Sequence, residues 1–227
     1  MEKKNRKIGI MGGTFDPIHI GHLILGEAAY EQFGLDEVWF LPAGNPPHKR
    51  NRAGQAKDAQ RVEMVRRAIA SNPHFVLCTK EMKDEGYTYS YRTLEAMRKE
   101  HPGTEFYFII GADSLFYFDE WKNPERICAA AKILVATRDR AKEEELLACM
   151  ERNAEKLHGT FLKHTESGCF FPRTAGMDPG RKIREILSAG FCDFLHSGAE
   201  NLSGLEEEQD GTVRFMETGQ KTPEGSR

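Results

Sequence analysis

Residues 12–22 combine residue types that could hold and polarise a phosphate group. Gly12 and Gly13 let the backbone come close to a ligand, because glycine has no Cβ. His19 and His22 are three residues apart, so on a helix they would share one face of the first turn. A helix N-terminus also offers free N–H groups and a positive dipole end to an anion. The pattern therefore predicts a phosphate site with two imidazoles directed at it.

Two flanking segments would position these side chains. Residues 8–11 form a short apolar run typical of a buried strand, and residues 23–30 follow the pattern of a helix. Taken alone, a glycine pair usually marks a turn, and a single histidine is usually an ordinary surface or core residue. The coincidence of both with a strand–loop–helix context is much more specific, and it favours the functional interpretation.

Apolar runs and helical patterns alternate along the first two thirds of the chain. Helical spacing follows Asp58, and a further helix is expected to begin at Ser90 or Thr93. This alternation predicts an α/β fold, a parallel sheet with helices on both faces. Residues 142–157 are charged and are expected to form an exposed helix. Strands are expected at residues 8–11, 38–41, 75–78, 106–110 and 132–136.

Three polar loops each follow an expected strand. They contain Gly12, His48 and Gly111, so they should gather at the carboxyl edge of the sheet, where ligands bind in folds of this class. The chain has neither a Walker loop nor a Gly-x-Gly-x-x-Gly motif, which disfavours a P-loop kinase and a dinucleotide dehydrogenase. The glycines and histidines of residues 12–22 instead suit a reaction in which an α-phosphate is attacked. In such a reaction a protein mainly positions the reactants and neutralises charge.

The same stretch carries a resemblance. Gly-Gly-Thr-Phe-Asp-Pro-x-His-x-Gly-His at residues 12–22 resembles the signature of the nucleotidyltransferase superfamily with the His-x-Gly-His motif. Residues 41–49, residues 108–115 and Trp121 resemble, within it, the bacterial nicotinate-mononucleotide adenylyltransferases, and the match extends from about residue 7 to residue 136. The resemblance implies a Rossmann-like nucleotidyltransferase fold. It also implies that ATP and nicotinate mononucleotide are joined to give deamido-NAD and pyrophosphate in NAD biosynthesis.

The ATP site is expected in the first loop. The backbone amides of Gly12, Gly13 and Thr14 would hold triphosphate oxygens, and Phe15 belongs to the same ATP-binding stretch. The catalytic residues would be His19 and His22, donating hydrogen bonds to oxygens that gain charge in the transition state. The resemblance implies Mg²⁺ on the phosphates, and such a cation is usually held by substrate oxygens and water. A metal site built from these histidines and His48 is disfavoured, because no Glu or Cys lies at matching spacing.

The second substrate is expected to contact residues from three further segments. The loop with His48 and Lys49 is either a basic surface loop or, as we favour, a lid that brings both side chains onto substrate phosphate. Tyr89 and Ser90 resemble the family's segment near the pyridine, although a plain helix cap is equally compatible. Asp113 could cap a helix or bind a ribose hydroxyl, and the resemblance favours the ribose. Trp121 could be a core residue or could stack on the pyridine ring, and both interpretations stay open.

The resemblance fails towards the C-terminus. Relatives close the ATP site with Ile-Ser-Ser-x-x-Ile-Arg, whereas residues 177–184 lack the serines and are one residue short. Lys182 and Arg184 are still expected to contact ATP phosphate at a helix start. Past Gly190 the family pattern is absent, so residues 181–190 are a family-like stretch between unfamiliar flanks. This suggests either a reading frame that shifted before Met177, returned near Lys182 and was lost again after Gly190, or true divergence. We therefore expect one nucleotidyltransferase domain at residues 1–200, atypical over 165–200, and a disordered tail at 201–227.

Bulk properties limit the partners. The net charge of −3 does not indicate a nucleic-acid partner. No stretch of the sequence is long and apolar enough to suggest a membrane-spanning helix. The five cysteines form no Cys-x-x-Cys pair and are expected to be reduced, so a cytoplasmic enzyme is expected, with a homo-oligomer allowed. Two rival functions stay open. One is a pantetheine-phosphate adenylyltransferase, disfavoured by the Pro-Pro-His-Lys loop. The other is a catalytically impaired nucleotide-binding protein, suggested by the missing serines.

Overall fold

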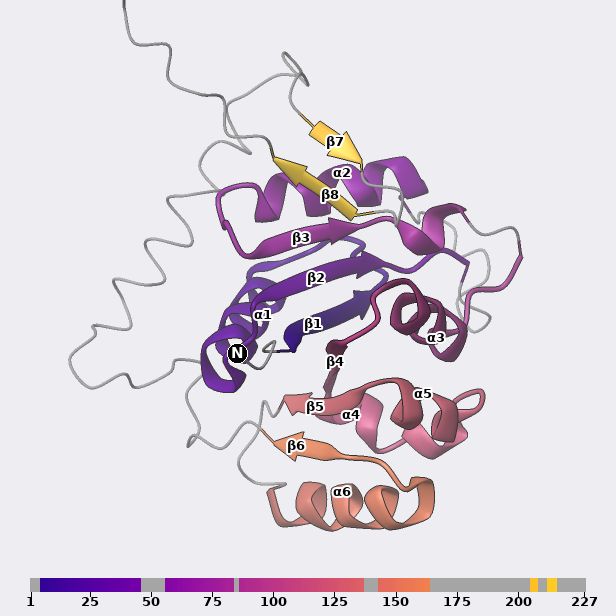
Figure 1. The fold of residues 1–227 in the computed structure, drawn as a ribbon. Coiled ribbons are helices and arrows are strands. Elements are labelled where there is room, and N and C mark those ends of the chain that lie inside the picture. Colours follow the sequence, from indigo (N-terminus) through magenta and orange to yellow (C-terminus); the bar gives the residue numbers. More distant parts are fainter. Residues whose placement is uncertain are drawn as a thin grey trace, which may run out of the picture.

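A computed structural model of the protein describes residues 5–45, 56–83, 86–136 and 143–163, together with the backbone of 205–207 and 212–215. Within this part of the chain one eight-stranded sheet forms, in the order β6-β5-β4-β1-β2-β3-β8-β7 (Figure 1). The strands are β1 Arg6–Gly13, β2 Glu37–Pro42, β3 Phe75–Cys78, β4 Thr104–Gly111, β5 Lys132–Ala136, β6 Phe161–Lys163, β7 Leu205–Glu207 and β8 Thr212–Phe215. The helices are α1 Ile20–Phe33, α2 Asp58–Ile69, α3 Ser90–Glu100, α4 Ala112–Leu115, α5 Pro124–Ala130 and α6 Glu143–Leu157, with 3₁₀ turns η1 Lys80–Lys83 and η2 Phe118–Glu120.

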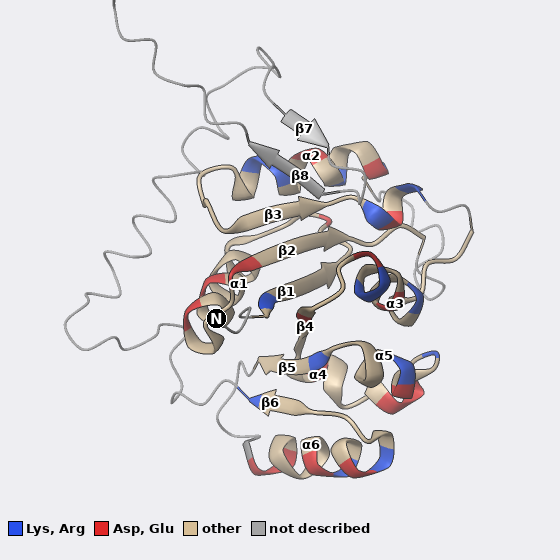
Figure 2. Cartoon of the chain, viewed as in Figure 1, with Lys and Arg blue, Asp and Glu red and all other residues tan. Residues whose placement is uncertain are grey.

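Strands β1 to β6 are all parallel, which confirms the predicted α/β fold. The central strand β1 pairs with both β2 and β4, so that Ile10 lies beside Trp39 on one side and beside Phe108 on the other. Strands in such sheets are buried on both faces and are therefore almost continuously apolar, as the middle of β1 and β4 is. Figure 2 shows the charged residues mainly on the helices and at strand ends.

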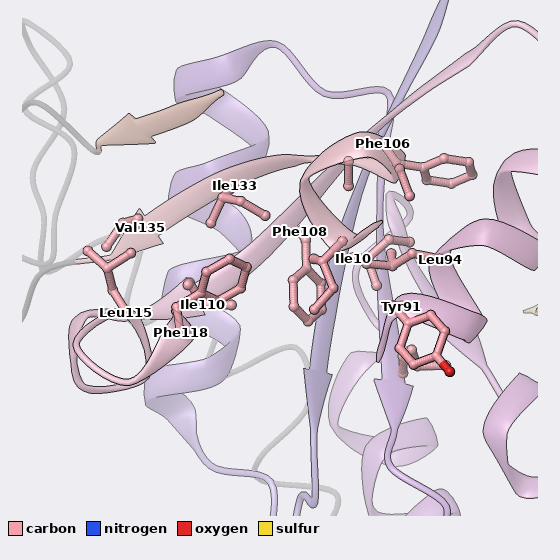
Figure 3. Close-up of a cluster of buried hydrophobic side chains, with 14 of the residues drawn as sticks. Ile10, Tyr91, Leu94, Phe106, Phe108, Ile110, Leu115, Phe118, Ile133 and Val135 are labelled. Carbon is pink, nitrogen blue, oxygen red and sulfur yellow. The ribbon is translucent and has the colours of Figure 1, made fainter. Parts of the chain in front are cut away.

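Helices cover both faces of the sheet, as expected. Successive side chains of a strand point to opposite faces, so Ile10 packs with α3 and α4 while Met11 packs on the side of α1 and α2. Figure 3 shows the first of these clusters, in which Leu94 of α3 and Leu115 of α4 meet the strand side chains. Because β1 lies between β2 and β4, the chain reverses its winding direction between β1 and β4. Crevices form at such a reversal, and ligands bind there in open α/β sheets.

The expectation of an exposed helix at 142–157 was wrong for one face of α6. Leu146 and Met150 are buried, whereas Leu147 remains exposed. Residues four apart share a helix face, and this face packs into the same cluster as α3 and α5. The short strand β6 then follows and extends the parallel sheet beyond the five predicted strands.

Two strands lie within the segment expected to be a disordered tail. β7 Leu205–Glu207 and β8 Thr212–Phe215 form an antiparallel pair, and β8 joins β3 antiparallel. The tail prediction is therefore corrected for these two segments. The physical reason is that β3 leaves an open edge of unpaired backbone groups, which a short alternating sequence can complete. The interpretation of residues 1–200 as one domain stays a prediction, because 164–204 lie outside the described residues.

None of the helices in the described ranges has the length and apolar character needed to cross a bilayer.

Candidate active site

A cavity of about 240 Å³ lies at the carboxyl ends of β1, β4 and β5. Its lining joins Gly12 from the end of β1 and His22 from the first turn of α1. It also includes Asp113 from the first turn of α4, and Trp121. The sequence placed these residues in three separate motifs, and the parallel topology brings them to one pocket. The pocket lies at the β1–β4 switch point, where the loops were expected to gather.

The start of α1 fixes the two histidines relative to each other. His19 is the N-cap residue and is exposed, and His22 occupies the third helical position. The backbone N–H of His19 donates a hydrogen bond to Nδ1 of His22 at 3.2 Å, and the two ring centroids are 3.9 Å apart. Because Nδ1 accepts this bond, a neutral His22 carries its ring proton on Nε2. The arrangement thus orients His22, which lines the cavity, as a donor through Nε2.

Phe15 supports this loop from beneath. Its side chain is buried, and its ring lies nearly perpendicular to the His22 ring, with centroids 5.1 Å apart. A Cβ at Gly13 would lie about 3.0 Å from the Phe15 ring, so the glycine lets the strand end pack tightly on it. The sequence placed Phe15 in the ATP-binding stretch, and its side chain contributes packing here rather than an exposed contact surface.

Sequence reasoning missed Arg61. This residue of α2 is fully buried, and its guanidinium donates to the carbonyl oxygens of Thr14 at 2.7 Å and Ala43 at 2.8 Å. It also pairs with Asp58 one turn earlier in α2, at 2.6 Å. Arg61 therefore ties the loop after β1 to the loop after β2. The only available signal was a charged residue next to Val62 and Val65 on a helix, and most such residues face solvent.

Glu81 of η1 is a second residue that the sequence did not single out. Its buried carboxylate accepts hydrogen bonds from the backbone N–H of Gly44 at 3.2 Å and from the hydroxyl of Thr93 at 2.8 Å. Glu81 thus fastens the loop after β2 to the first turn of α3. The backbone N–H of Thr88 completes the connection by donating to the carbonyl of Asn45 at 3.1 Å.

The residues predicted to contact the second substrate do not all lie at the cavity. Tyr89 is the N-cap of α3 and Ser90 its first residue. Both are half-buried beside the loop after β2, and neither lines the cavity. Trp121 does line it, and it also packs against Phe108 and Phe118 with ring centroids 6.2 and 5.4 Å away. The core and ligand-facing interpretations of Trp121 are therefore compatible.

Four predicted site residues cannot be placed. His48, Lys49, Lys182 and Arg184 lie outside the described residues. Within the described ranges, no group of three or more His, Cys, Asp and Glu side chains is arranged to hold a metal ion. The cavity lining combines the imidazole of His22 and the glycines Gly12 and Gly21 at the end of β1 and the start of α1, a setting that suits an anion, with the carboxylate of Asp113.

Known proteins resemble this chain in sequence. The cytidylyltransferase-like family model matches residues 10–216. A protein named "Probable nicotinate-nucleotide adenylyltransferase" from Lachnoclostridium phytofermentans is 46% identical over 142 residues, which cover 63% of this chain and 70% of that protein. A protein of the same name from Bacillus pumilus is 50% identical over 116 residues, which cover 51% of this chain and 61% of that relative. The chain thus spans between about three fifths and seven tenths of these relatives' lengths.

Solved structures resemble it in fold. The nicotinic acid mononucleotide adenylyltransferase of Plasmodium falciparum matches with a TM-score of 0.54 in its complex with NaAD and 0.52 in its complex with APC. The sequence identity is 20%, and the matches cover 70% of this chain and 74% and 73% of the respective solved chains. At this identity the likeness concerns the fold alone.

Proposed function

This chain belongs to the cytidylyltransferase-like family, and on that basis we propose that it transfers the adenylyl group of ATP to nicotinate mononucleotide. The products are deamido-NAD and pyrophosphate, so the enzyme is a nucleotidyltransferase of NAD biosynthesis. The observation that carries the proposal is the cavity at the β1–β4 switch point, where Gly12, His22, Asp113 and Trp121 meet. The names of the relatives that are 46% and 50% identical support the choice of acceptor.

The reaction needs positioning and charge stabilisation rather than a covalent protein intermediate. A phosphate oxygen of nicotinate mononucleotide attacks the α-phosphorus of ATP, and the bond from that phosphorus to the pyrophosphate oxygen breaks. Negative charge shifts to the leaving pyrophosphate and to the α-phosphate oxygens. Backbone amides of residues 12–14, the N-terminus of α1, the imidazole of His19 and Nε2 of His22 would donate hydrogen bonds to these oxygens. The 3.2 Å bond from the His19 N–H to His22 Nδ1 keeps the required tautomer.

The remaining predicted residues keep their proposed roles. Asp113 would bind a ribose hydroxyl, Trp121 would stack on the pyridine, and Tyr89 and Ser90 would flank the acceptor. His48 and Lys49 would contact the acceptor phosphate, and Lys182 and Arg184 the ATP phosphates. Mg²⁺ would enter with ATP, held by phosphate oxygens and water, and would neutralise charge on the triphosphate. A cytoplasmic location remains part of the proposal, and a homo-oligomer remains compatible with it.

The direct test is pyrophosphate release from Mg-ATP with three acceptors offered separately. We expect release to be dominant with nicotinate mononucleotide over nicotinamide mononucleotide and phosphopantetheine. Dominant release with phosphopantetheine would assign the rival activity. Binding of ATP without release, in folded protein, would instead identify an impaired nucleotide-binding protein.

A variant pair tests the role of His22. We expect His22→Ala to lower kcat by about 10²-fold or more with little loss of ATP binding, because it removes a donor used mainly in the transition state. The matched control is His158→Asn. His158 is exposed and follows the C-terminus of α6, and Asn tolerates its positive φ of 50°. An unchanged kcat in His22→Ala would remove His22 from the mechanism.

A further inference from the structure

Arg61 connects two loops that the proposed reaction must hold in register. Its guanidinium donates to Thr14, in the loop between β1 and α1, and to Ala43, in the loop that leaves β2. In sequence these partners are 47 and 18 residues away from it. One planar group with fixed donor directions therefore sets how far apart the two carbonyl oxygens lie.

Backbone hydrogen bonds also connect the loop after β1 with the loop after β2, so the guanidinium reinforces an existing contact. The N–H of Ala43 donates to the carbonyl of Gly13 at 2.7 Å. The N–H of Ala56, just before α2, donates to the carboxylate of Asp16 at 3.2 Å. The loop after β1 thus contacts both the loop after β2 and the approach to α2.

Burial makes Arg61 unlike its neighbours on the same helix. Its side chain is about 1% exposed, whereas those of Arg66 and Arg67 are 15% and 33% exposed and pair with Glu63 on α2 itself. A buried cation is costly unless its donors are satisfied, so each oxygen around Arg61 stabilises the arrangement. Asp58 provides the compensating charge from a largely exposed position.

We propose that Arg61 is a positioning residue that couples the two substrate loops, so that binding of one nucleotide favours binding and alignment of the other. Arg61 itself touches no substrate. It acts through the backbone of Thr14, on the ATP side, and of Ala43, on the acceptor side. The inference rests on the proposed function, which assigns one substrate to each loop. Because such coupling is reciprocal, it is measurable from either substrate.

The experiment compares Arg61→Gln and Arg61→Lys with Arg67→Gln, which removes an arginine from the surface of the same helix. Calorimetry measures the affinity for a non-hydrolysable ATP analogue with and without nicotinate mononucleotide, and pyrophosphate release gives kcat and KM. For Arg61→Gln we expect a fall in kcat of about 10²-fold, because misplacement by about 1 Å has effects of this size. The coupling factor should approach one, while analogue affinity measured alone changes less than about threefold. Arg61→Lys should recover part of the coupling, since it keeps the charge but not the fork.

The outcomes separate the alternatives. Wild-type coupling and kcat in a folded Arg61→Gln protein would overturn the inference, as would an equal loss in Arg67→Gln. If both Arg61 variants fail to fold, Asp58→Asn replaces them, because it keeps Arg61 but removes the carboxylate that orients it. A partial loss of coupling in Asp58→Asn supports the inference, and an unchanged coupling factor overturns it. If the wild-type protein releases no pyrophosphate with any acceptor, the proposed function fails. In that case the role of Arg61 is decided by calorimetry alone. A coupling factor of one in the wild-type protein would mean that the two ligands do not affect each other, and it would overturn the inference.

Discussion

Replacing Gly44 by alanine should disturb one substrate loop without touching the other. A Cβ at this position would lie 2.2 Å from the backbone oxygen of Glu81 and 2.9 Å from Cγ2 of Thr88. The first of these atoms belongs to the main chain, so no side-chain rotation relieves the contact. The loop or η1 must therefore move by about 1 Å to reach ordinary contact distance.

The displacement acts on contacts that hold the loop. It stretches the 3.2 Å hydrogen bond from the Gly44 N–H to Glu81 and shifts the adjacent Ala43 carbonyl that Arg61 binds. Overpacking of this kind costs about 1–3 kcal/mol in the free energy of unfolding. We expect the KM for nicotinate mononucleotide to rise by about tenfold or more, because the loop leads to the proposed acceptor-phosphate residues. Affinity for an ATP analogue measured alone should stay within about twofold, since the β1–α1 loop keeps its own strand and helix.

The assay pairs urea unfolding with pyrophosphate release at varied acceptor concentration. Gly34→Ala is the control. Gly34 ends α1 with φ of 56°, and a Cβ there meets nothing within 4 Å, so alanine adds only backbone strain of about 1–2 kcal/mol. It should lower stability and leave KM unchanged, because the end of α1 lies at the opposite edge of the sheet from the cavity. Wild-type stability and KM in Gly44→Ala would refute the packing argument, and an equal KM change in Gly34→Ala would show that destabilisation alone is responsible.

Three further predictions follow from other contacts. Trp121→Ala should raise the acceptor KM several-fold and Trp121→Phe much less, because a ring still lines the cavity. Steady-state kinetics checks this, and equal effects would argue against stacking. Arg66, and to a lesser extent Arg67, lower the pKa of Glu63 to about 2. The stabilisation from these pairs is therefore complete above about pH 4.5 and is lost as the pH falls towards 2. Urea unfolding of wild type and Glu63→Gln should therefore differ at pH 7 and converge at low pH. A constant difference would contradict the assignment. Leu94→Ala, at a side chain 1% exposed, should cost about 2–5 kcal/mol in unfolding free energy with KM unchanged.

Much of the parallel sheet could be predicted because its strands are continuous apolar runs in the sequence. Residues 106–110 and 133–136 form uninterrupted runs of aromatic and aliphatic residues, as strands buried on both faces require. The glycines and histidines of the first loop also carry a local signal, since strand end, turn and helix start follow within a few residues. The structure confirms this local context, and it places Gly12, His22, Asp113 and Trp121 at one cavity. Their roles in binding and catalysis stay predictions.

The contacts behind the loops gave no such signal. Arg61 meets Thr14 across 47 residues, and Glu81 meets Gly44 across 37. A charged side chain in an amphipathic helix or a short turn is compatible with a solvent-facing position, and nothing local reveals which distant carbonyl or N–H it will meet. The same limitation applies to α6, where the apolar residues indicate a face but not that a partner covers it.

The edge of the sheet shows a different limitation. Thr212-Val213-Arg214-Phe215 alternates polar and apolar residues, which is the pattern of a strand, but its polar surroundings pointed to a disordered tail. Its pairing with β3 depends on an open edge supplied by residues more than 130 positions earlier, such as Leu77 opposite Val213. Short edge strands are decided by the sheet they join rather than by their own propensity.

The topology explains why the meeting of the loops could be predicted from the sequence while the contacts behind the loops could not. In a parallel sheet, loops from distant parts of the chain meet at the carboxyl edge because of strand order, so their arrival at one pocket follows from the pattern of strands and helices. Strand order does not fix the distance between two neighbouring loops to the fraction of an ångström that joining two phosphates requires. That distance needs rigid, buried side chains behind the loops. Arg61 is one, because its terminal nitrogens donate to both loops, and Glu81 is another, because its carboxylate accepts from Gly44 and Thr93. If this division is correct, exchanging Arg61 should alter the coupling between the two substrates, whereas exchanging Trp121, which lines the cavity, should alter the affinity for the acceptor alone.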